Sequence, residues 1–350
     1  MLPVLRLRTN AATLPGGSGR SSPRASTLPV GAGGSSPRAS TLRRGALGGL
    51  AVITGLVLAA CGSSGSSSSS SSSSSNPLTA GGSKGVVVGS ANFPENELLA
   101  EIYVLALQAK GVKVTSKFNI GSREVYYPEV KNGAITIIPE YNGALLTTSV
   151  DTTSSAATTA EVDAALTSKL PSTLEILNSS AAQDKDSVTV TQATATKDHL
   201  TSIADLKAYA SSFVIGGPSE FKTRTDGLIG LTKNYGLTFK SFDPLDESGP
   251  VTLAALVDGK VQAADVFTTT PQIITDHLVA LADPKFNFAA QNVVPLVYKK
   301  GVNPTIVATL NAISAKLTTA GLLAMDKAVI LDHDNYSTVA KGWLSAVGLG

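Results

Sequence analysis

The chain has 350 residues, of which 43% are hydrophobic and 15% are charged, and its formal net charge is +2. Seven arginines and no acidic residue precede Cys61, so without residues 1–60 the formal charge falls to −5. Nucleic-acid binding needs a basic face, which a mildly acidic chain with scattered charges lacks. We therefore expect no nucleic-acid partner.

Residues 1–83 do not have the composition of a folded core, because they are mostly Ser, Gly, Pro and Arg. Residues 43–61 contain two arginines, then an apolar run, then small residues before a cysteine. This is the three-part layout of a secretory signal, and the run is too short and too glycine-rich for a comfortable membrane span. Residues 1–60 are thus predicted to be a signal peptide or leader.

The single cysteine, Cys61, ends the sequence Leu58-Ala59-Ala60-Cys61, which resembles the bacterial lipobox. The resemblance implies that the thiol is acylated and that Cys61 begins the mature protein. An incidental cysteine after an ordinary signal peptide is the alternative. A lone thiol in an exported protein has no disulfide partner, and lipidation explains it.

Residues 61–83 are therefore predicted to be a lipidated cysteine and a serine-rich linker. About 20 polar residues behave as a random coil that reaches roughly 25 Å. Such a linker would tether an exported domain to the outer face of the cell membrane.

Strand and helix patterns alternate from residue 84 onward. Val86–Val88 is a short apolar strand, and Pro94 opens a helix with apolar residues at helical spacing as far as Ala109. An alternating strand over 112–120, a helix from Ser122 and an apolar strand over 134–141 follow. The order βαβαβ predicts a parallel sheet.

A second α/β unit follows a polar segment, residues 151–173. Its predicted elements are a strand over 187–191, a helix over 203–210 with a Ser202/Asp205 capping box, a strand over 213–217, a helix opened by Pro218, a helix over 251–259 and a strand over 261–267. A strand over 293–300 and three helices, over 304–317, 319–331 and 336–347, complete the chain.

The fold class predicted from this order is α/β with two lobes joined by two hinge crossings. Residues 84–185 and 293–350 would form lobe I, because the chain returns to the first unit near its end. Residues 186–292 would form lobe II. Ligands of open parallel sheets bind beyond the carboxyl ends of the strands, which places the predicted site in the cleft between the lobes.

Three motifs carry a family resemblance. They are Pro139-Glu140-Tyr141-Asn142-Gly143, Glu220-Phe221 followed by Arg224, Asp226, Gly227 and Leu228, and Asp265-Val266-Phe267-Thr268-Thr269. In this order and spacing, residues 84–350 resemble the substrate-binding lipoproteins of osmoprotectant ABC importers, the glycine betaine, carnitine and choline class. The resemblance implies a type II periplasmic-binding-protein fold that closes on its ligand, with an ABC permease and an ATPase as partners.

The same resemblance implies an aromatic cage, because a quaternary ammonium donates no hydrogen bond and is held by ring faces. Tyr141 matches the cage tyrosine and Arg224 matches the arginine that clamps the ligand carboxylate. Phe267 is expected to contact the cationic or apolar end of the ligand. Asp186 and Gln291, where relatives have tyrosines, would tune selectivity.

Four further residues belong to the predicted site. Phe93 and Asn92 follow the first strand, where Phe93 would contact the ligand and Asn92 would either offer an amide or only start the helix. Asn142 and Thr268 lie inside the motifs. The sequence also departs from the family pattern at Ala91 and Ala144, so we expect fewer polar side chains on the side of the site that binds the ligand carboxylate.

Enzyme and metal-binding functions are poorly supported by the sequence. Ser219 and Lys222 match Ser-x-x-Lys, but the companion motifs of that hydrolase class are missing. His199, His277 and His333 are scattered, and no phosphate loop occurs, so no metal and no cofactor are expected. Two alternatives stay open: a binding protein for a polyphenol or an amino-acid derivative, and a sensor without a transport role.

Overall fold

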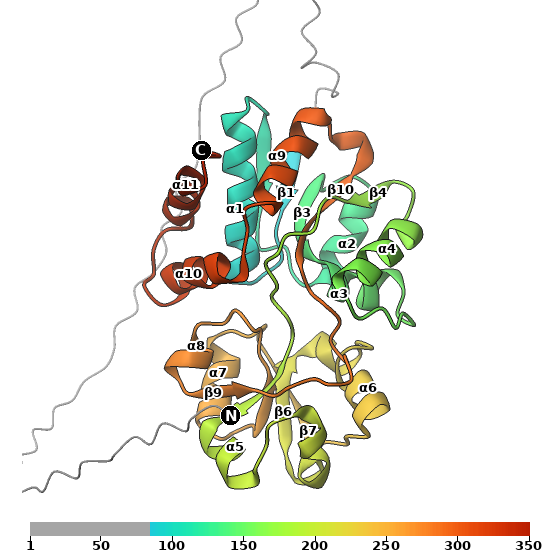
Figure 1. Cartoon of the computed structure of the whole chain (residues 1–350), viewed down its shortest axis with the longest axis vertical. Helices are drawn as coiled ribbons and strands as arrows, with labels where there is room; N and C mark the ends of the chain where they lie inside the picture. The colour runs from blue at the N-terminus through green and yellow to red at the C-terminus, as the bar shows by residue number, and fades with distance from the viewer. Residues whose placement is uncertain (1–84) are drawn as a thin grey trace, which may run out of the picture. The chain divides into compact units, whose positions relative to one another are not determined.

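The computed structural model describes residues 85–350, and the predictions for residues 1–83 lie outside this range. Two five-stranded sheets, each covered by helices, make up the described part of the chain (Figure 1). The first sheet has the order β2-β1-β3-β10-β4 and the second has the order β7-β6-β8-β5-β9. Each sheet is thus the centre of its own α/β layer structure.

The first sheet combines an early segment of the chain with a late one. Its strands are β1 (Val86–Gly89), β2 (Val114–Lys117), β3 (Ile137–Tyr141), β4 (Leu174–Ile176) and β10 (Val293–Tyr298). Strand β1 is parallel to both β2 and β3, whereas β10 is antiparallel to β3, with Val293 opposite Tyr141. The return of β10 fixes the end of β3, which carries Tyr141.

The helices of this sheet are α1 (Pro94–Ala109), α2 (Arg123–Lys131), α3 (Asn142–Leu145) with a π-helical turn over Leu146–Val150, α4 (Thr159–Lys169), α9 (Pro304–Ser314), α10 (Thr319–Ile330) and α11 (Tyr336–Ala346). Helix α1 is buried along most of its length, including Leu98, Leu99 and Ile102. Its apolar residues are not confined to one stripe, as expected of a helix that packs on several sides. Helices α9, α10 and α11 all pack against it.

The second sheet is formed by β5 (Val188–Thr191), β6 (Val214–Pro218), β7 (Ser241–Leu245), β8 (Ala263–Asp265) and β9 (Leu278–Ala280). Its short helices are α5 (Gln192–Asp198), α6 (Leu228–Gly230), α7 (Pro250–Val257) and α8 (Gln272–Thr275). Strand β6 is parallel to β7 and β8, while β5 is antiparallel to β8 and β9. The chain passes from β4 to β5 and returns from β9 to β10, so two segments connect the sheets (Figure 1).

The prediction of parallel sheets is wrong for one strand in each sheet. Strands β5 and β10 are the ones that follow the two crossings. A strand that enters a sheet from the other lobe starts at the edge where the parallel strands end, and it therefore runs in the opposite direction. The βαβαβ order predicted for residues 84–141 is confirmed.

Several local predictions are corrected by the structure. The strand predicted over 112–120 is shorter, Val114–Lys117, because Asn119 adopts a positive φ of 53° that ends the extended backbone. The Ser202/Asp205 capping box is present, but it starts a 3₁₀ helix, Ile203–Ala208, instead of an α-helix. The predicted three C-terminal helices are confirmed.

Helix α4 and strand β7 were not expected from the sequence pattern. Helix α4 begins with a complete capping box, Thr158 with Glu161, but buries only Val162 and Leu166. A helix with so few buried residues has almost no apolar periodicity to detect.

Among residues 85–350, no single helix is long and apolar enough to cross a membrane. Helices α9 and α10 would be long and apolar enough only as a pair, and a bend of 91° separates them.

Candidate ligand-binding site

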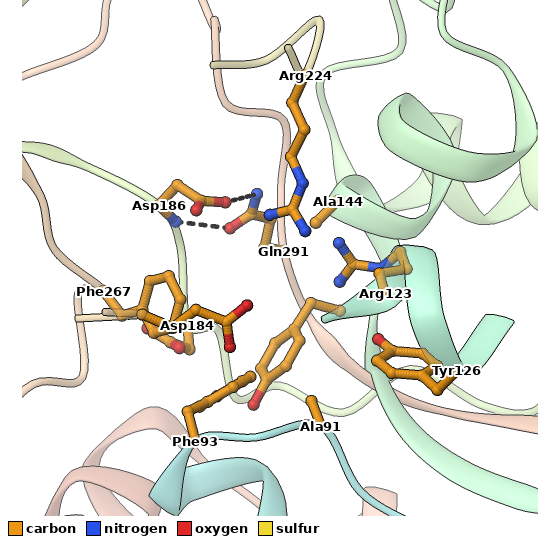
Figure 2. A pocket seen from close by; sticks show the side chains of 12 residues that line it. Ala91, Phe93, Arg123, Tyr126, Ala144, Asp184, Asp186, Arg224, Phe267 and Gln291 are labelled. Atoms are coloured by element: carbon orange, nitrogen blue, oxygen red, sulfur yellow. Dashed lines mark hydrogen bonds between the residues drawn. The ribbon is translucent and has the colours of Figure 1, made fainter. Parts of the chain in front are cut away.

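A cavity of about 40 Å³ lies where the ends of the central strands meet the two crossing segments. Its residues come from both sheets and from both crossings (Figure 2). They are Ala91, Phe93, Arg123, Tyr126, Tyr141, Ala144, Asp184, Asp186, Arg224, Glu247, Phe267 and Gln291. We call this the main cavity.

One side of the main cavity is aromatic. Phe93, which immediately precedes α1, lies between Tyr141 at the end of β3 and Phe267 just after β8. The ring centroids are 5.9 Å apart for Phe93 and Tyr141 and 5.1 Å apart for Phe93 and Phe267. Three electron-rich ring faces at this spacing can attract a cation that has no hydrogen to donate.

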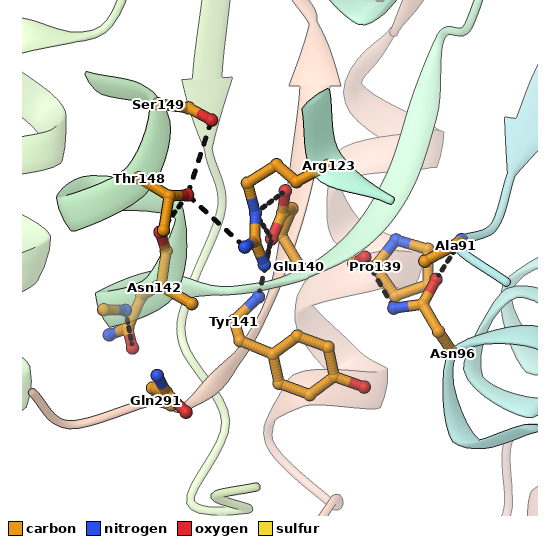
Figure 3. Close-up of polar contacts among 12 residues, drawn as sticks. Ala91, Asn96, Arg123, Pro139, Glu140, Tyr141, Asn142, Thr148, Ser149 and Gln291 are labelled. Carbon is orange, nitrogen blue, oxygen red and sulfur yellow. Dashed lines mark hydrogen bonds and ion pairs between the residues drawn. The ribbon is translucent and has the colours of Figure 1, made fainter. Parts of the chain in front are cut away.

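Tyr141 is held in place by its hydroxyl group and by its backbone. The hydroxyl donates to Glu95 Oε1 at 2.6 Å, and Thr269 donates to the other oxygen of the same carboxyl group at 2.6 Å. Asn96 links the two strand ends, since it accepts from Ala91 N at 2.8 Å and donates to Pro139 O at 3.0 Å (Figure 3). The ring that the sequence singled out is therefore rigidly supported.

The other side of the main cavity carries two guanidinium groups. Arg123, at the start of α2, donates to both oxygens of Glu140 at 3.0 to 3.2 Å (Figure 3). Tyr126 donates to the same carboxylate at 2.7 Å. Arg224 donates from Nε and Nη2 to Glu124 at 3.0 and 3.1 Å. Within residues 85–350, Nη1 of Arg224 has no hydrogen-bond acceptor, so its two N–H groups are available to an anion.

The Arg224 pair changes the acidity of its partner. Burial opposes ionisation of Glu124, but the hydrogen bonds and the charge of Arg224 outweigh it and lower the pKa of Glu124 to about 2. Glu124 is thus ionised at any physiological pH.

Asp186 and Gln291 join the two crossing segments at the wall of the cavity. The backbone N–H of Asp186 donates to Gln291 Oε1 at 2.7 Å, and Gln291 Nε2 donates to Asp186 Oδ2 at 2.7 Å (Figure 2). Asp184 lies two residues before Asp186 in the chain and accepts a hydrogen bond from Thr269 N at 3.1 Å. Burial raises the pKa of Asp184 well above its ordinary value.

Six of the nine ligand-binding residues predicted from the sequence line the main cavity: Phe93, Tyr141, Asp186, Arg224, Phe267 and Gln291. The other three lie elsewhere. Asn142 is fully buried and donates to Asp163 while accepting from Gly143 N and Asn292 N (Figure 3). Thr268 accepts from Lys185 N at 2.8 Å, and Asn92 lines a neighbouring cavity.

Arg123, Tyr126, Asp184 and Glu247 line the cavity but were not predicted to bind ligand. Arg123 had a detectable signal, because it follows Ser122 at a predicted helix start just after a strand. Glu247 and Asp184 had none, since they lie in irregular segments. No group of three or more His, Cys, Asp or Glu side chains within residues 85–350 is arranged to hold a metal ion.

Comparison with known proteins identifies the family. Residues 84–346 match the model of the substrate-binding domain of ABC-type glycine betaine transport systems. The glycine betaine-binding protein YehZ of Escherichia coli K12 is 26% identical over 276 residues, which cover 75% of this chain and 90% of YehZ.

One further relative and one solved structure are also similar to this chain. The ergothioneine transport permease/ergothioneine binding protein EgtU of Helicobacter pylori G27 is 24% identical over 278 residues, 78% of this chain but only 49% of EgtU, so the chain spans about half of that protein. A crystal structure of a glycine betaine/carnitine/choline ABC transporter shares the fold, with a TM-score of 0.58 and 21% identity over 75% of this chain and 99% of that one. The type II periplasmic-binding-protein fold is confirmed, and the chain belongs to the family of substrate-binding domains of ABC-type glycine betaine transport systems.

Proposed function

We propose that this chain captures a small zwitterionic or cationic osmoprotectant in the main cavity and delivers it to an ABC permease and its ATPase, without performing chemistry. The observation that carries the proposal is the division of one cavity into an aromatic side and a guanidinium side. A quaternary ammonium is attracted to ring faces, and a carboxylate pairs with a guanidinium fork. A betaine carries both groups.

Each of the six predicted residues that line the main cavity has a defined role in this proposal. Phe93, Tyr141 and Phe267 would surround the ammonium group. The free Nη1 of Arg224 would hold the carboxylate, while Asp186 and Gln291 would select among ligands by hydrogen bonding. Arg123 would add positive charge behind the carboxylate, although its Nε and Nη2 already donate to Glu140 and its Nη1 donates to Thr148.

The position of the receptor in the cell is part of the proposal. Residues 1–60 would be removed, Cys61 would be acylated, and residues 61–83 would tether the domain to the outer face of the membrane. Residues 84–185 and 293–350 would form lobe I and residues 186–292 lobe II, with hinges at the two crossings. Closure of two hinged lobes is the usual way in which such receptors enclose a ligand.

Isothermal titration calorimetry with glycine betaine, choline, carnitine and proline tests this function. We expect at least one of them to bind, and Tyr141→Ala to weaken that binding at least tenfold, about 1.4 kcal/mol. Tyr141→Phe keeps the ring and should retain most of the affinity. Tyr209→Ala is the matched control, because Tyr209 packs on Phe213 in the second sheet's core, away from the cavity.

The proposal fails in two distinguishable ways. If none of the four compounds produces heat, the osmoprotectant assignment is wrong. If one binds but Tyr141→Ala, with an unchanged circular dichroism spectrum, binds it equally well, then the main cavity is not the site.

A zwitterion with an additional hydrogen-bonding group is a second candidate. The observation that favours it is the Asp186–Gln291 pair, which places polar groups where a simple cage would have rings. One relative is named as an ergothioneine binding protein. Tighter binding of ergothioneine than of glycine betaine, with loss of this preference in Gln291→Leu, would establish it.

A further inference from the structure

A second cavity, of about 220 Å³, adjoins the main cavity. Phe93 and Phe267 line both, and their rings pack edge to face, so they form a common wall. The remaining walls come from the carboxyl-terminal half of α10 and from the starts of α7 and α8. We call this the side cavity.

The side cavity contains an unusual excess of hydrogen-bond acceptors. Four buried side-chain oxygens there accept no hydrogen bond from a backbone N–H, a hydroxyl or a basic group within the described residues: Glu247 Oε2, Gln272 Oε1 and both carboxyl oxygens of Asp326. The Asp326 carboxyl group instead lies within hydrogen-bond reach of the Glu95 carboxyl group. Asp326 is only 1% exposed. An unsatisfied buried acceptor costs about 1–3 kcal/mol, so four in one cavity favour a ligand that brings hydrogen-bond donors with it.

The lining contains no basic side chain that could supply these donors. Among the residues that line the side cavity there is no Lys, Arg or His, and two further carboxyl groups, Glu95 and Asp184, are present. The hydroxyl of Thr269 already donates to Glu95 at 2.6 Å, and that of Thr270 is paired with Ser248 at 2.7 Å. Burial raises the pKa of Asp326 well above its ordinary value, which is the expected result for a carboxyl group that lacks a cation.

The rest of the lining is apolar. It includes Pro94, Pro250, Leu253, Phe267, Val329 and Ile330. A ligand that satisfies both parts of the lining needs an apolar or aromatic body and a charged group with several N–H donors. A primary ammonium has three such donors, whereas a quaternary ammonium has none.

We propose that the side cavity is a second ligand-binding site, for a primary ammonium group carried on an apolar or aromatic body, in which Asp326, Glu247 and Gln272 accept the N–H groups. The apolar walls would bury the body of the ligand. This proposal does not depend on the osmoprotectant function, because it assigns a different ligand class to Asp326 and Gln272, which do not line the main cavity, and to Glu247, which lines both cavities.

Calorimetric titration of the full chain with 2-phenylethylammonium tests the side cavity. We expect binding at least tenfold tighter than that of two probes that lack the ammonium N–H groups, 2-phenylethanol and N,N,N-trimethyl-2-phenylethylammonium. Asp326→Asn keeps the shape of the side chain and removes its charge, and it should weaken the primary ammonium about tenfold. Leu253→Trp fills the space and should abolish binding.

Arg224→Ala is the control that separates the two cavities, because Arg224 lines the main cavity but not the side cavity. It should leave 2-phenylethylammonium binding unchanged. Absence of binding to the unmodified chain, equal binding of all three probes, or unchanged affinity in folded Asp326→Asn and Leu253→Trp would each overturn the proposal. Loss of binding in Arg224→Ala with retention in Leu253→Trp would move the amine to the main cavity and would also overturn it.

Discussion

Two arginine–glutamate pairs line the main cavity, and they differ in burial and in what they connect. Arg123 and Glu140 belong to α2 and β3 of the first sheet's half, and their side chains are 8% and 0% exposed. Arg224 follows β6 in the second sheet's half and reaches back across 100 residues to Glu124, with exposures of 12% and 47%.

This difference assigns the two pairs different tasks. A fully buried pair cannot lose one partner without leaving a charge in a medium of low dielectric constant. An exposed pair can exchange its partner for water or for a ligand at little cost. The Arg123–Glu140 pair therefore forms a permanent wall of the cavity, whereas the Arg224–Glu124 pair links the two halves and can respond to ligand.

The largest effect is expected from Glu140→Gln. It leaves the guanidinium of Arg123 buried without a counter-charge, and the free energy of unfolding should fall by about 3 kcal/mol. Urea denaturation followed by circular dichroism measures this loss. Glu124→Gln is the matched change in the exposed pair and should cost less than about 1 kcal/mol. Equal losses in the two variants would contradict the distinction between the pairs.

A smaller and more selective effect is expected from Arg224→Lys. Lysine keeps the charge but loses the planar fork that can hold Glu124 and a ligand carboxylate together. Binding of glycine betaine should weaken about tenfold, roughly 1.4 kcal/mol. Choline has the same ammonium group without a carboxylate, so its affinity should change little. Calorimetry with both ligands decides the matter, and an equal loss for both would place Arg224 outside the carboxylate contact.

The smallest effect is a pH dependence of the exposed pair. The pKa of Glu124 is lowered to about 2 in the folded chain, below its ordinary value near 4.3 in an unfolded one. The pair therefore stabilises the fold fully above about pH 4.5, and this contribution is lost as the pH falls towards 2. The stability difference between the unmodified chain and Glu124→Gln should shrink between pH 6 and pH 3 in thermal denaturation. A difference that stays constant over this range would show that the pair does not form.

The elements that local patterns describe well were predictable. Helix α1 has a proline start, a long apolar run and a glycine just beyond its end, and the structure places it at Pro94–Ala109. Helix α4 was missed because it buries only two residues. The reversed direction of β5 and β10 was also missed. The direction of each of these strands depends on its entering the sheet from the other lobe, which a local pattern does not show.

The residues of the candidate site were likewise predictable only in part. Tyr141 and Phe267 were predicted because they lie in motifs that resemble the family, and Phe93 because it follows the first strand; the structure brings their rings together. Asn142 and Thr268 lie in the same motifs, but each accepts a hydrogen bond from a backbone N–H of a crossing segment, Asn292 N for Asn142 and Lys185 N for Thr268. A motif indicates which residues lie near strand ends, but the direction of each side chain depends on its partners.

The sequence alone determined the α/β class and the order of most strands and helices, because these depend on apolar periodicity and on residues close together in the chain. Its resemblance to a family indicated Tyr141 and Phe267 as ligand contacts. The tertiary structure decided the arginine–glutamate pairing, the burial that shifts the pKa values and the existence of the side cavity. Each of these depends on residues that are far apart in the chain, such as Glu124 with Arg224 and Asp326 with Glu247. Their proximity is a property of how the halves pack together, and no local pattern of residues carries it.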